Sequence, residues 1–516
     1  MSKSERRIIQ STVFVVVVLA FLVTGFLNMC VTEAPQPNFV IFSVDTLRAD
    51  HLGCYGNNRW DRSPSPVADA LAARGVLFEE CTVPRGQTHP AIASMLSGRY
   101  PITHGLRENG QRPGPEFHSF VEHLRSSGYA TAGFAANLKK EWSRGDERRV
   151  GWWTAGFESV GDGFSGDPLR EIKTDPLHQS AWDQRVEEQA LRWIEQQRTR
   201  LETPFLLWVH FYDVHKPYTL TLESPRFDPG YDGPLTAGAT ATENPVLHPD
   251  PLTAALNAAT LAGKPLAPRD QSYVMACYDA GIAGVDSRIG RILQALETAG
   301  LNENTWTVYT SDHGEELGDH NDYYYHGASI YDSVLRIPLI FSGPTTTSPR
   351  RIKGLVQNVD LAPTILELAG IKVSAPPMEG RSFAELLEDD TVTTARHREL
   401  ALAEWQDLIY AVSDGHTKYI FNPEDTCPVK PPWKGRGGRG NGEGARGFRY
   451  AVEEIYDLGE DPLEQRNLID SRRNQARFMQ GMLKDWLARL PVGGGRFAGR
   501  DIEADERWKL LEGLGY

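Results

Sequence analysis

The chain has 516 residues, 40% of them hydrophobic and 10% aromatic, a composition typical of a globular protein with one large domain or two ordinary ones. Its formal net charge of −14 argues against a general nucleic-acid binder, because such proteins usually carry a basic face. The five cysteines show no metal-finger spacing and do not form a disulfide framework.

The N-terminus predicts a membrane anchor. Residues 1–7 form a basic tail, and residues 8–31 contain about twenty apolar residues without a charge, enough to span a bilayer with the N-terminus in the cytoplasm. A cleaved or lipidated signal is the alternative, although Met29 is large for the residue before a lipoprotein cysteine. In each version residues 32–37 form a linker and the rest of the chain lies outside the cytoplasm, in the periplasm or the extracellular space.

Residues 38–398 alternate buried strands with amphipathic helices. Near-continuous apolar runs, typical of strands buried on both faces, lie at 39–44, 130–136, 204–211, 305–311 and 337–343. Helical patterns, several of them closed by glycine, lie at 66–75, 119–128, 184–197 and 286–300. The predicted class is therefore α/β, with a doubly wound, mostly parallel sheet flanked by helices.

Two segments depart from this alternation. Residues 219–269 are rich in Pro, Ala, Thr and Leu and have weak periodicity, which predicts an insertion, either a lid over the site or a surface excursion. From residue 399 onwards short antiparallel strands are expected, with a turn at Asp414 and Gly415, so residues 399–516 are predicted to form a small α+β subdomain. Its basic, glycine-rich loop at 433–447 is expected to be flexible and solvated, with contact to an anionic substrate or surface as the alternative.

Two carboxylates directly follow predicted strands. Asp45 comes after the run at 39–44, and Asp312 comes after the run at 305–311. Ligands bind at the carboxyl edge of such sheets, so these side chains can meet although they are far apart in sequence. Asp312 is followed by His313, and carboxylate with imidazole suits zinc or manganese, whereas a carboxylate-rich set suits calcium. A shared metal site is favoured over a hydrogen-bonded loop pair.

The chain resembles the sulfatase family of the alkaline phosphatase superfamily. The motifs that carry the resemblance occur in the family's order and span roughly residues 38–470. They are FVIFSVDTLRADHLGCYG, THPAIASMLSGRYPITHG, HFYDVHKPY, TSDHGEELGDH, HGASIYDSVLRIPLIF, NVDLAPTILELAG and EIYDLGEDPLEQRNL. The resemblance implies that Asp45, Asp312 and His313 are metal ligands, while Thr46 replaces a neighbouring acid of the family. It also implies that His215 and His326 contact the substrate.

Other polar residues are expected outside the site. His104 matches a motif histidine that is often structural, and Asp360 has the position of a helix N-cap. His210 lies inside a strand and is expected in the core or behind the ligands, and His89 has no clear counterpart in the family.

Thr88 occupies the nucleophile position of the motif. Formylglycine sulfatases use the cysteine of Cys-x-Pro-x-Arg, a fixed distance before the glycine of a TGR-like sequence. Thr88 has Pro90 two residues on and lies ten residues before Gly98, whereas Cys81 lies seventeen residues before Gly98. Pro90 also predicts a helix start, where free N–H groups and the helix dipole favour an alkoxide. The alternative is that Thr88 at or just before the N-cap only caps this helix.

The substitution changes the expected chemistry. Threonine is not converted to formylglycine, so none is expected; Ile92 stands where the motif has arginine, and residues 135–140 lack the family's Gly-Lys-Trp-His, with Lys139 or Lys140 as possible substitutes. A metal-bound threonine resembles the phosphodiesterases and phosphoethanolamine transferases of the superfamily.

The predicted function is an extracytoplasmic, metal-dependent hydrolase of sulfate or phosphate esters, with phosphoesters favoured. Thr88 would be the nucleophile, bound with Asp45, Asp312 and His313 to one zinc, manganese or calcium ion, and His215 and His326 would stabilise charge or protonate the leaving oxygen. One alternative is a phosphoryl-group transferase, phosphoethanolamine-like, acting on cell-envelope glycan or lipid. Another is a catalytically silent relative that binds anionic glycans. The expected partners are an anionic ester, glycan or lipid, and the membrane through the N-terminal helix, with no nucleic acid and the oligomeric state open.

Overall fold

The computed structural model describes residues 35–114, 117–138, 151–162, 178–216, 218, 227–236, 251–262, 265–320, 323–346, 348–373, 377–389, 391, 397–406, 408–423 and 450–489. The predicted anchor at 8–31 and the basic loop at 433–447 lie outside these residues. Within the described part of the chain, no helix has both the length and the apolar character needed to cross a bilayer.

The centre of the fold is an eight-stranded mixed sheet with the order β4-β3-β5-β1-β6-β7-β2-β8. Its strands are β1 (Asn38–Val44), β2 (Val76–Thr82), β3 (Ala130–Ala135), β4 (Ser159–Asp162), β5 (Phe205–Phe211), β6 (Thr305–Ser311), β7 (Arg336–Ser342) and β8 (Arg350–Gln357). Neighbouring strands are parallel except that β7 runs antiparallel to both β6 and β2. The predicted mostly parallel sheet is thus confirmed, and the run at 337–343 is its antiparallel member.

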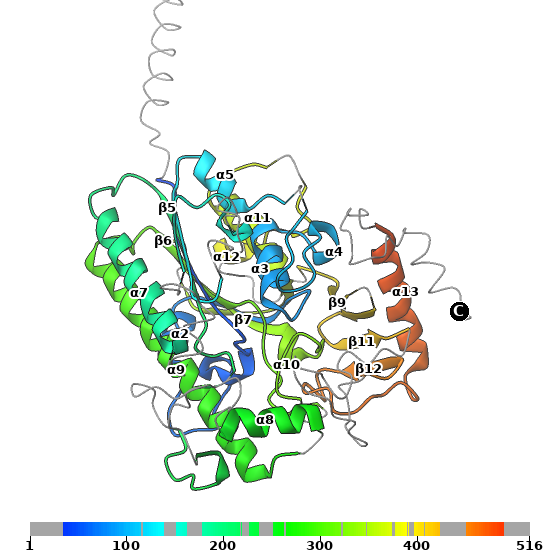
Figure 1. The fold of residues 1–516 in the computed structure, drawn as a ribbon. Helices are drawn as coiled ribbons and strands as arrows, with labels where there is room; N and C mark the ends of the chain where they lie inside the picture. Colours follow the sequence, from blue (N-terminus) through cyan, green and yellow to red (C-terminus); the bar gives the residue numbers. More distant parts are fainter. Residues whose placement is uncertain are drawn as a thin grey trace, which may run out of the picture. The chain divides into compact units, whose positions relative to one another are not determined.

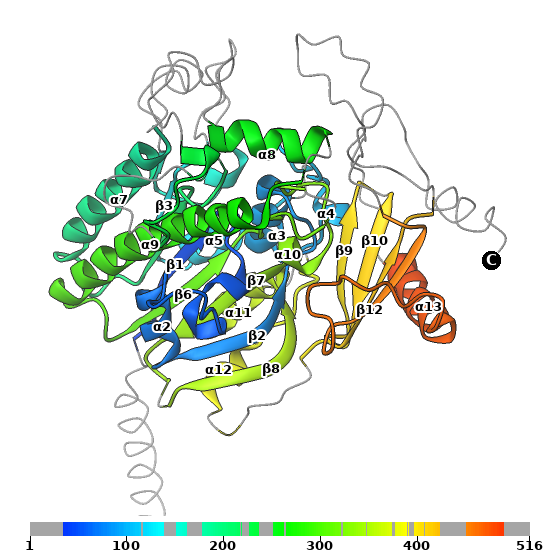
Figure 2. The ribbon, with the colours of Figure 1, turned by 90° about the horizontal axis from the view of Figure 1, so that it is seen from below.

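Helices cover both faces of this sheet (Figure 1; Figure 2). One face carries α2 (Pro66–Ala72), α7 (His178–Gln197) and α9 (Pro268–Thr298), and the other carries α3 (Thr88–Ser97), α5 (Phe120–Ser126), α11 (Leu361–Leu368) and α12 (Ala384–Glu388). Alternate residues of β1 pack into the hydrophobic cores on the two faces of the sheet. Phe39 and Ile41 pack with α3, α5 and α11, whereas Val40 and Phe42 pack with α7 and α9. This two-sided burial explains the continuous apolar run in the sequence of β1.

The segment predicted as an insertion at 219–269 contains a regular helix. This helix, α8, spans Pro251–Ala262, and α9 begins at Pro268, within the last two residues of the segment. Thr260 of α8 accepts a hydrogen bond at 3.0 Å from the backbone N–H of Tyr324. The helix therefore contacts the loop that leads to His326.

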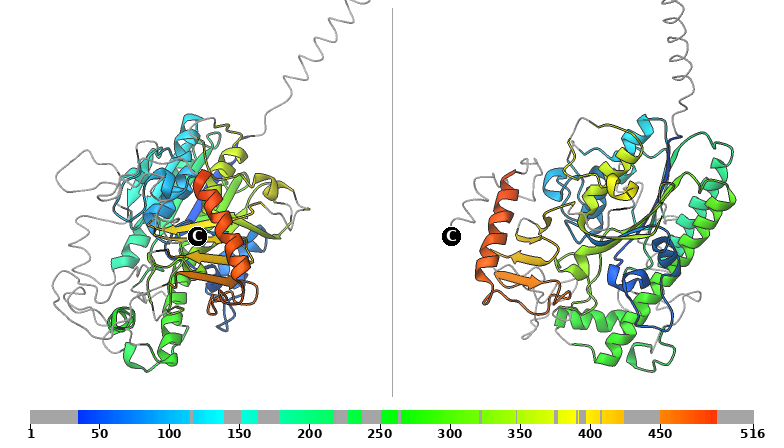
Figure 3. Two further views of the ribbon diagram at one scale, coloured as in Figure 1. Left: turned by 90° about the vertical axis from the view of Figure 1, so that its right-hand side faces the viewer. Right: turned by 180° about the vertical axis from the view of Figure 1, so that it is seen from behind.

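The C-terminal subdomain is a four-stranded antiparallel sheet covered by one helix (Figure 3). Its elements are β9 (Ala401–Trp405), β10 (Ile409–Ser413), β11 (Thr417–Phe421), β12 (Glu453–Asp457) and α13 (Arg473–Arg489). Met479 and Leu483 of α13 pack with Leu402 and Val412 of the sheet. The predicted turn is present: Gly415 has φ 88°, and Asp414 Oδ1 accepts from the N–H of Thr417 at 2.8 Å.

The short helix α4 (Pro101–His104) ends on a buried histidine that predicts acid sensitivity. The N–H of Leu106 donates to His104 Nδ1 at 3.1 Å, so the proton of the neutral ring sits on Nε2, 3.0 Å from Ser94 Oγ. Burial lowers the pKa of His104 to about 3. Because this is below the pKa in the unfolded chain, the unfolded state binds more protons between the two values. The contribution of the neutral, buried His104 to the free energy of unfolding is therefore complete above about pH 6.5 and is lost as the pH falls below that value.

We expect His104 to account for about 2 kcal/mol of the stability lost between pH 7 and pH 5. Urea unfolding of wild type and His104→Gln at both pH values measures it, and the pH-dependent loss should be smaller in the variant by that amount. An equal loss in both proteins would contradict the assignment.

Candidate active site

The candidate active site lies at the carboxyl edge of four neighbouring strands, β3, β5, β1 and β6. Val44, the last residue of β1, pairs with Phe211 of β5 and Ser311 of β6, so Asp45 and Asp312 leave their strands at the same level. The backbone of Thr46 has φ 60°, an unusual value for a β-branched residue, and its N–H donates to Asp312 Oδ1 at 3.2 Å. A strained turn of this kind is typical of functional sites, and here it ties the two carboxylates together.

The four side chains predicted as metal ligands converge. His313 Nε2 lies 3.4 Å from Thr88 Oγ1, 3.5 Å from Asp312 Oδ2 and 3.8 Å from Asp45 Oδ1, and Thr88 Oγ1 is 3.5 Å from Asp45 Oδ2. Ligands bound at about 2.1 Å in a tetrahedron are about 3.4 Å apart, which is close to these separations. His313 Nδ1 lies 2.8 Å from the carbonyl of Gly314; donation there leaves the Nε2 lone pair facing the oxygens.

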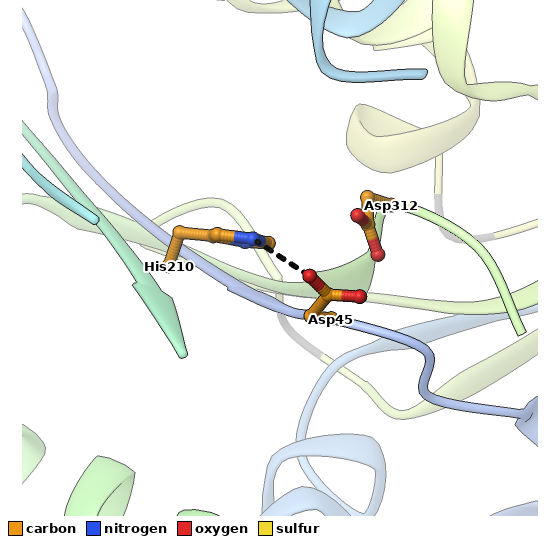
Figure 4. Close-up of side chains that lie close together, drawn as sticks. All are labelled: Asp45, His210 and Asp312. Carbon is orange, nitrogen blue, oxygen red and sulfur yellow. Dashed lines mark ion pairs between the residues drawn. The ribbon is translucent and has the colours of Figure 1, made fainter. Parts of the chain in front are cut away.

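Several buried atoms of this cluster have no hydrogen-bond partner in the described part of the chain: Asp45 Oδ1, Asp312 Oδ2 and His210 Nε2. The ligand atoms of Asp45, His210 and Asp312 all lie within 4.8 Å of one another, close enough to hold a metal ion (Figure 4). Burial, together with the charge of Asp312, holds the pKa of Asp45 well above its usual range. Since an unsatisfied buried acceptor costs about 1–3 kcal/mol, the unpartnered carboxylate oxygens of Asp45 and Asp312 fit a divalent cation.

His210 is nearer to the carboxylates than its position in a strand suggested. It is fully buried, as expected, but its Nε2 lies 3.9 Å from Asp45 Oδ2. Burial lowers the pKa of His210 to about 4. The register that pairs His210 with Ser43 at the end of β1 brings it there, and this register could not be read from the sequence.

Thr88 is the first residue of α3, and the N-cap is Gln87. Thr88 therefore does not itself cap the helix, which corrects the predicted position by one residue. Its side chain is buried and its hydroxyl faces Asp45 and His313. A helix N-terminus favours negative charge, so the location stabilises an alkoxide or a bound anion.

The two histidines expected to contact substrate lie beside the ligand group. The ring centroids of His326 and His313 are 4.4 Å apart, and those of His326 and His215 are 5.0 Å apart. His326 Nδ1 is 3.0 Å from Glu315 Oε1, and His215 Nδ1 is 2.6 Å from the carbonyl of Lys216. Burial lowers the pKa of His215 to about 4, so this ring is neutral near pH 7.

Tyr325 covers this pair of histidines. It stacks on His326 with centroids 4.2 Å apart, and its side chain is 42% exposed. Lys216 Nζ lies 5.8 Å from the centre of the Tyr325 ring and donates to the carbonyl of Tyr324 at 3.1 Å. An aromatic ring and an ammonium group therefore stand beside the histidines.

The positions of the motif arginine and of the Gly-Lys-Trp-His segment of formylglycine sulfatases carry other residues in this chain. Ile92, a residue of α3, is fully buried in the hydrophobic core. Asn137 follows β3 and donates through Nδ2 to Asp45 Oδ2. Asn137 could not be recognised from the sequence, because an isolated asparagine after a strand carries no motif signal. Lys139 and Lys140 lie outside the described residues.

The residues expected outside the site are placed elsewhere. His104 is bonded to Ser94, and Asp360 precedes α11 and forms an ion pair with Arg398 rather than a side-chain cap. His89 Nδ1 accepts from the N–H of Gly110 at 3.1 Å.

Cys81 is a core residue of β2. It is fully buried, pairs with Ile337 of β7 and Val356 of β8, and burial raises the pKa of its thiol well above the usual value. A thiol of this kind is unreactive. We expect Cys81→Ala to keep kcat/KM within about threefold while lowering stability by about 1 kcal/mol. A loss of activity comparable to that of Thr88→Ala, measured on the folded variant, would contradict this.

Comparisons with known proteins agree with the fold. A family model described as Sulfatase matches residues 37–371. The chain is 28% identical over 462 residues to the uncharacterized sulfatase YidJ of Escherichia coli (strain K12), covering 85% of this chain and 84% of that protein. Among solved structures, the phosphonate monoester hydrolase of Agrobacterium radiobacter superposes with a TM-score of 0.62 at 21% identity, covering 88% and 95% of the two chains. A protein solved in complex with its substrate D-glucosamine-2-N,6-O-disulfate superposes with a TM-score of 0.63 at 20% identity, covering 88% and 98%.

Proposed function

Because the chain belongs to the sulfatase family of the alkaline phosphatase superfamily and is an ester hydrolase of that family, we propose that it uses Thr88 as a nucleophile against phosphate or sulfate esters. The observation that carries the proposal is the position of Thr88 Oγ1, 3.4 Å from His313 Nε2 and 3.5 Å from Asp45 Oδ2, at the start of α3. No other described hydroxyl has recorded contacts with both of these side chains.

Asp45, Asp312 and His313 would hold one divalent ion together with Thr88. A cation bound there lowers the pKa of a neighbouring hydroxyl and neutralises part of the charge of an anionic ester. The spacing of the four ligand atoms and the mixture of one nitrogen with three oxygens favour zinc or manganese over calcium.

Thr88 Oγ1 would attack sulfur or phosphorus in line with the departing ester oxygen. Its proton can pass to Asp45, whose Oδ2 lies 3.5 Å from Thr88 Oγ1. His326, held by Glu315 through Nδ1, would bind the ester beside the leaving oxygen. Because burial holds the pKa of His326 well below its usual range, this ring is neutral near pH 7, and the leaving oxygen would take its proton from water. His215, neutral near pH 7, suits the second step, in which water loses a proton as it releases the group from Thr88.

Phosphoesters are the favoured substrates because Thr88 cannot be converted to formylglycine, the group that formylglycine sulfatases use. The structural likeness to a phosphonate monoester hydrolase is compatible with this preference, and the relative that binds a disulfated glucosamine keeps sulfated sugars as the second candidate. The decisive experiment compares an aryl sulfate, a phosphate monoester, a phosphodiester, a phosphonate monoester and a sulfated glucosamine, each with zinc, manganese or calcium. The expected result is the highest kcat/KM on a phosphorus ester, and the absence of turnover on every ester with every metal would overturn the proposal.

We also propose that residues 8–31 anchor the chain, with residues 38–398 as the catalytic part and 399–516 as its subdomain outside the cytoplasm. The support is the length and apolar character of the N-terminal segment and its flanking positive charges. Release of the full chain from membranes by alkaline carbonate, or its protection from protease in spheroplasts, would contradict this.

A further inference from the structure

Two buried imidazoles reach the carboxylates of the site, His313 and His210, and their surroundings differ. His313 Nε2 lies 3.4–3.8 Å from three separate oxygen atoms, those of Thr88, Asp45 and Asp312. His210 Nε2 lies 3.9 Å from Asp45 Oδ2, at the end of a side chain that is fully buried in β5. Figure 4 shows the ring of His210 pointing edge-on at the Asp45 carboxylate.

The other nitrogen of His210 belongs to a chain of hydrogen bonds. Trp208 Nε1 is 2.8 Å from Ser43 Oγ, and Ser43 Oγ is 2.8 Å from His210 Nδ1. An indole N–H can only donate, so the Ser43 oxygen accepts from Trp208. The Ser43 oxygen has a second lone pair, so the direction of its contact with His210 follows from the other ring nitrogen. Nε2 faces the carboxylate oxygen Asp45 Oδ2, an acceptor, which favours a proton on Nε2 and donation from the Ser43 hydroxyl to Nδ1. A neutral imidazole that accepts at Nδ1 carries its proton on Nε2, and a protonated nitrogen has no lone pair for a metal.

The oxygen that His210 faces already receives a donor. Asn137 Nδ2 donates to Asp45 Oδ2, the same oxygen, whereas Asp45 Oδ1 has no hydrogen-bond partner and lies 3.8 Å from His313 Nε2. The two carboxylate oxygens of Asp45 thus have different neighbours. The side-chain nitrogens of Asn137 and His210 lie on the side of Oδ2, whereas Oδ1 faces His313 Nε2.

From this arrangement we propose that His210 is a positioning residue whose Nε2–H, fixed by Ser43 and Trp208, orients Asp45 through Oδ2, and that His313 alone is the imidazole ligand. At 3.9 Å, His210 Nε2 is too far from Asp45 Oδ2 for a direct hydrogen bond. A small movement of the carboxylate would bring the two atoms within hydrogen-bond distance, or a bound water molecule would bridge them. Asp45 would then bind a cation through Oδ1. This inference deepens the proposed function and rests on the metal site formed by Asp45, Asp312 and His313.

Metal affinity separates a positioning residue from a ligand. Zinc dissociation constants, measured by competition with a chelating dye, are compared for the full chain, His210→Phe, His210→Gln and His313→Ala. We expect His210→Phe to keep the dissociation constant within about threefold while kcat falls about 10–100-fold at nearly constant KM, as for partners that act behind a ligand. His210→Gln places an amide N–H near the position of Nε2 and should recover most of kcat. His313→Ala should weaken zinc binding at least about 100-fold. Equal weakening in His210→Phe and His313→Ala would make His210 a ligand and overturn the inference.

The tautomer gives a test that needs no metal and no activity. In the metal-free full chain labelled with ring-¹⁵N histidine, the signals of His210, assigned by their loss in His210→Gln, should show the proton on Nε2. In Ser43→Ala, which keeps the ring but removes the hydroxyl, the Nδ1–H form should become populated. A proton on Nδ1 in wild type would overturn the inference even where His210→Phe fails to fold. If the proposed function failed instead, wild type would bind no zinc, while His210 would still carry its proton on Nε2.

Discussion

Replacement of Thr88 by alanine is expected to lower kcat by at least about 10⁴-fold, because the variant loses the atom that forms the covalent bond with the substrate. The change should leave the fold intact. Gln87 rather than Thr88 is the N-cap residue of α3, and within the described residues the Thr88 hydroxyl contacts Asp45 and His313. Initial rates on the best substrate, with circular dichroism and zinc binding measured on the same preparation, check the result.

Two variants serve as controls for Thr88→Ala. Thr88→Ser keeps the hydroxyl at the start of α3 and should retain measurable turnover, so a large gap between serine and alanine isolates the nucleophile from packing. Cys81→Ala tests the competing cysteine, which lies in the core of β2. Should Thr88→Ala retain activity within tenfold of wild type, the nucleophile would have to be sought elsewhere or the observed activity assigned to bound water.

The elements that the sequence could predict are those with a single dominant pattern. β1, β3, β5 and β6 are buried on both faces, and their apolar runs are therefore continuous. β8 carries Arg351 and Lys353 on an exposed face at the edge of the sheet, and β2 carries Glu79 and Glu80, so neither has such a run. The antiparallel direction of β7 depends on pairing with strands distant in sequence, which no local pattern encodes.

The same distinction holds for the site. Asp45 and Asp312 could be placed together because both follow strands that share an edge, and Thr88 could be placed from its spacing to Gly98. Asn137 was not predicted, and His210 could be predicted only as a core residue or one behind the ligands, since their contacts with Asp45 depend on the order β3-β5-β1, which brings the ends of three strands side by side. The sequence thus identified the charged groups of the site, and the fold was needed for the neutral donors that orient them.

Removal of the metal is expected to abolish turnover, with zinc or manganese restoring it and calcium restoring little. The physical reason is the donor set: one imidazole nitrogen and three oxygens at 3.4–3.8 Å from it suit a small ion, whereas calcium prefers six to eight oxygens at longer distances. Dialysis against EDTA, metal analysis of the dialysed chain, and titration of activity with each ion measure the effect. Saturating metal should also stabilise the chain by about 2.7 kcal/mol when its concentration is one hundred times the dissociation constant.

The variant Asp312→Asn tests whether this dependence of turnover on the metal arises at the proposed site. The variant keeps an oxygen near the position of Oδ2 but loses the negative charge, so we expect zinc affinity to fall at least about 100-fold and activity to require correspondingly more metal. Asp286→Asn is the matched control, because Asp286 is also a buried aspartate but binds the N–H groups of Val67 and Ala68 at the start of α2. It should lower stability without changing the dissociation constant for zinc. Equal zinc affinity in wild type and Asp312→Asn would place the metal elsewhere and remove the basis for activating Thr88, since its hydroxyl would then lie beside Asp45 and His313 with no cation between them.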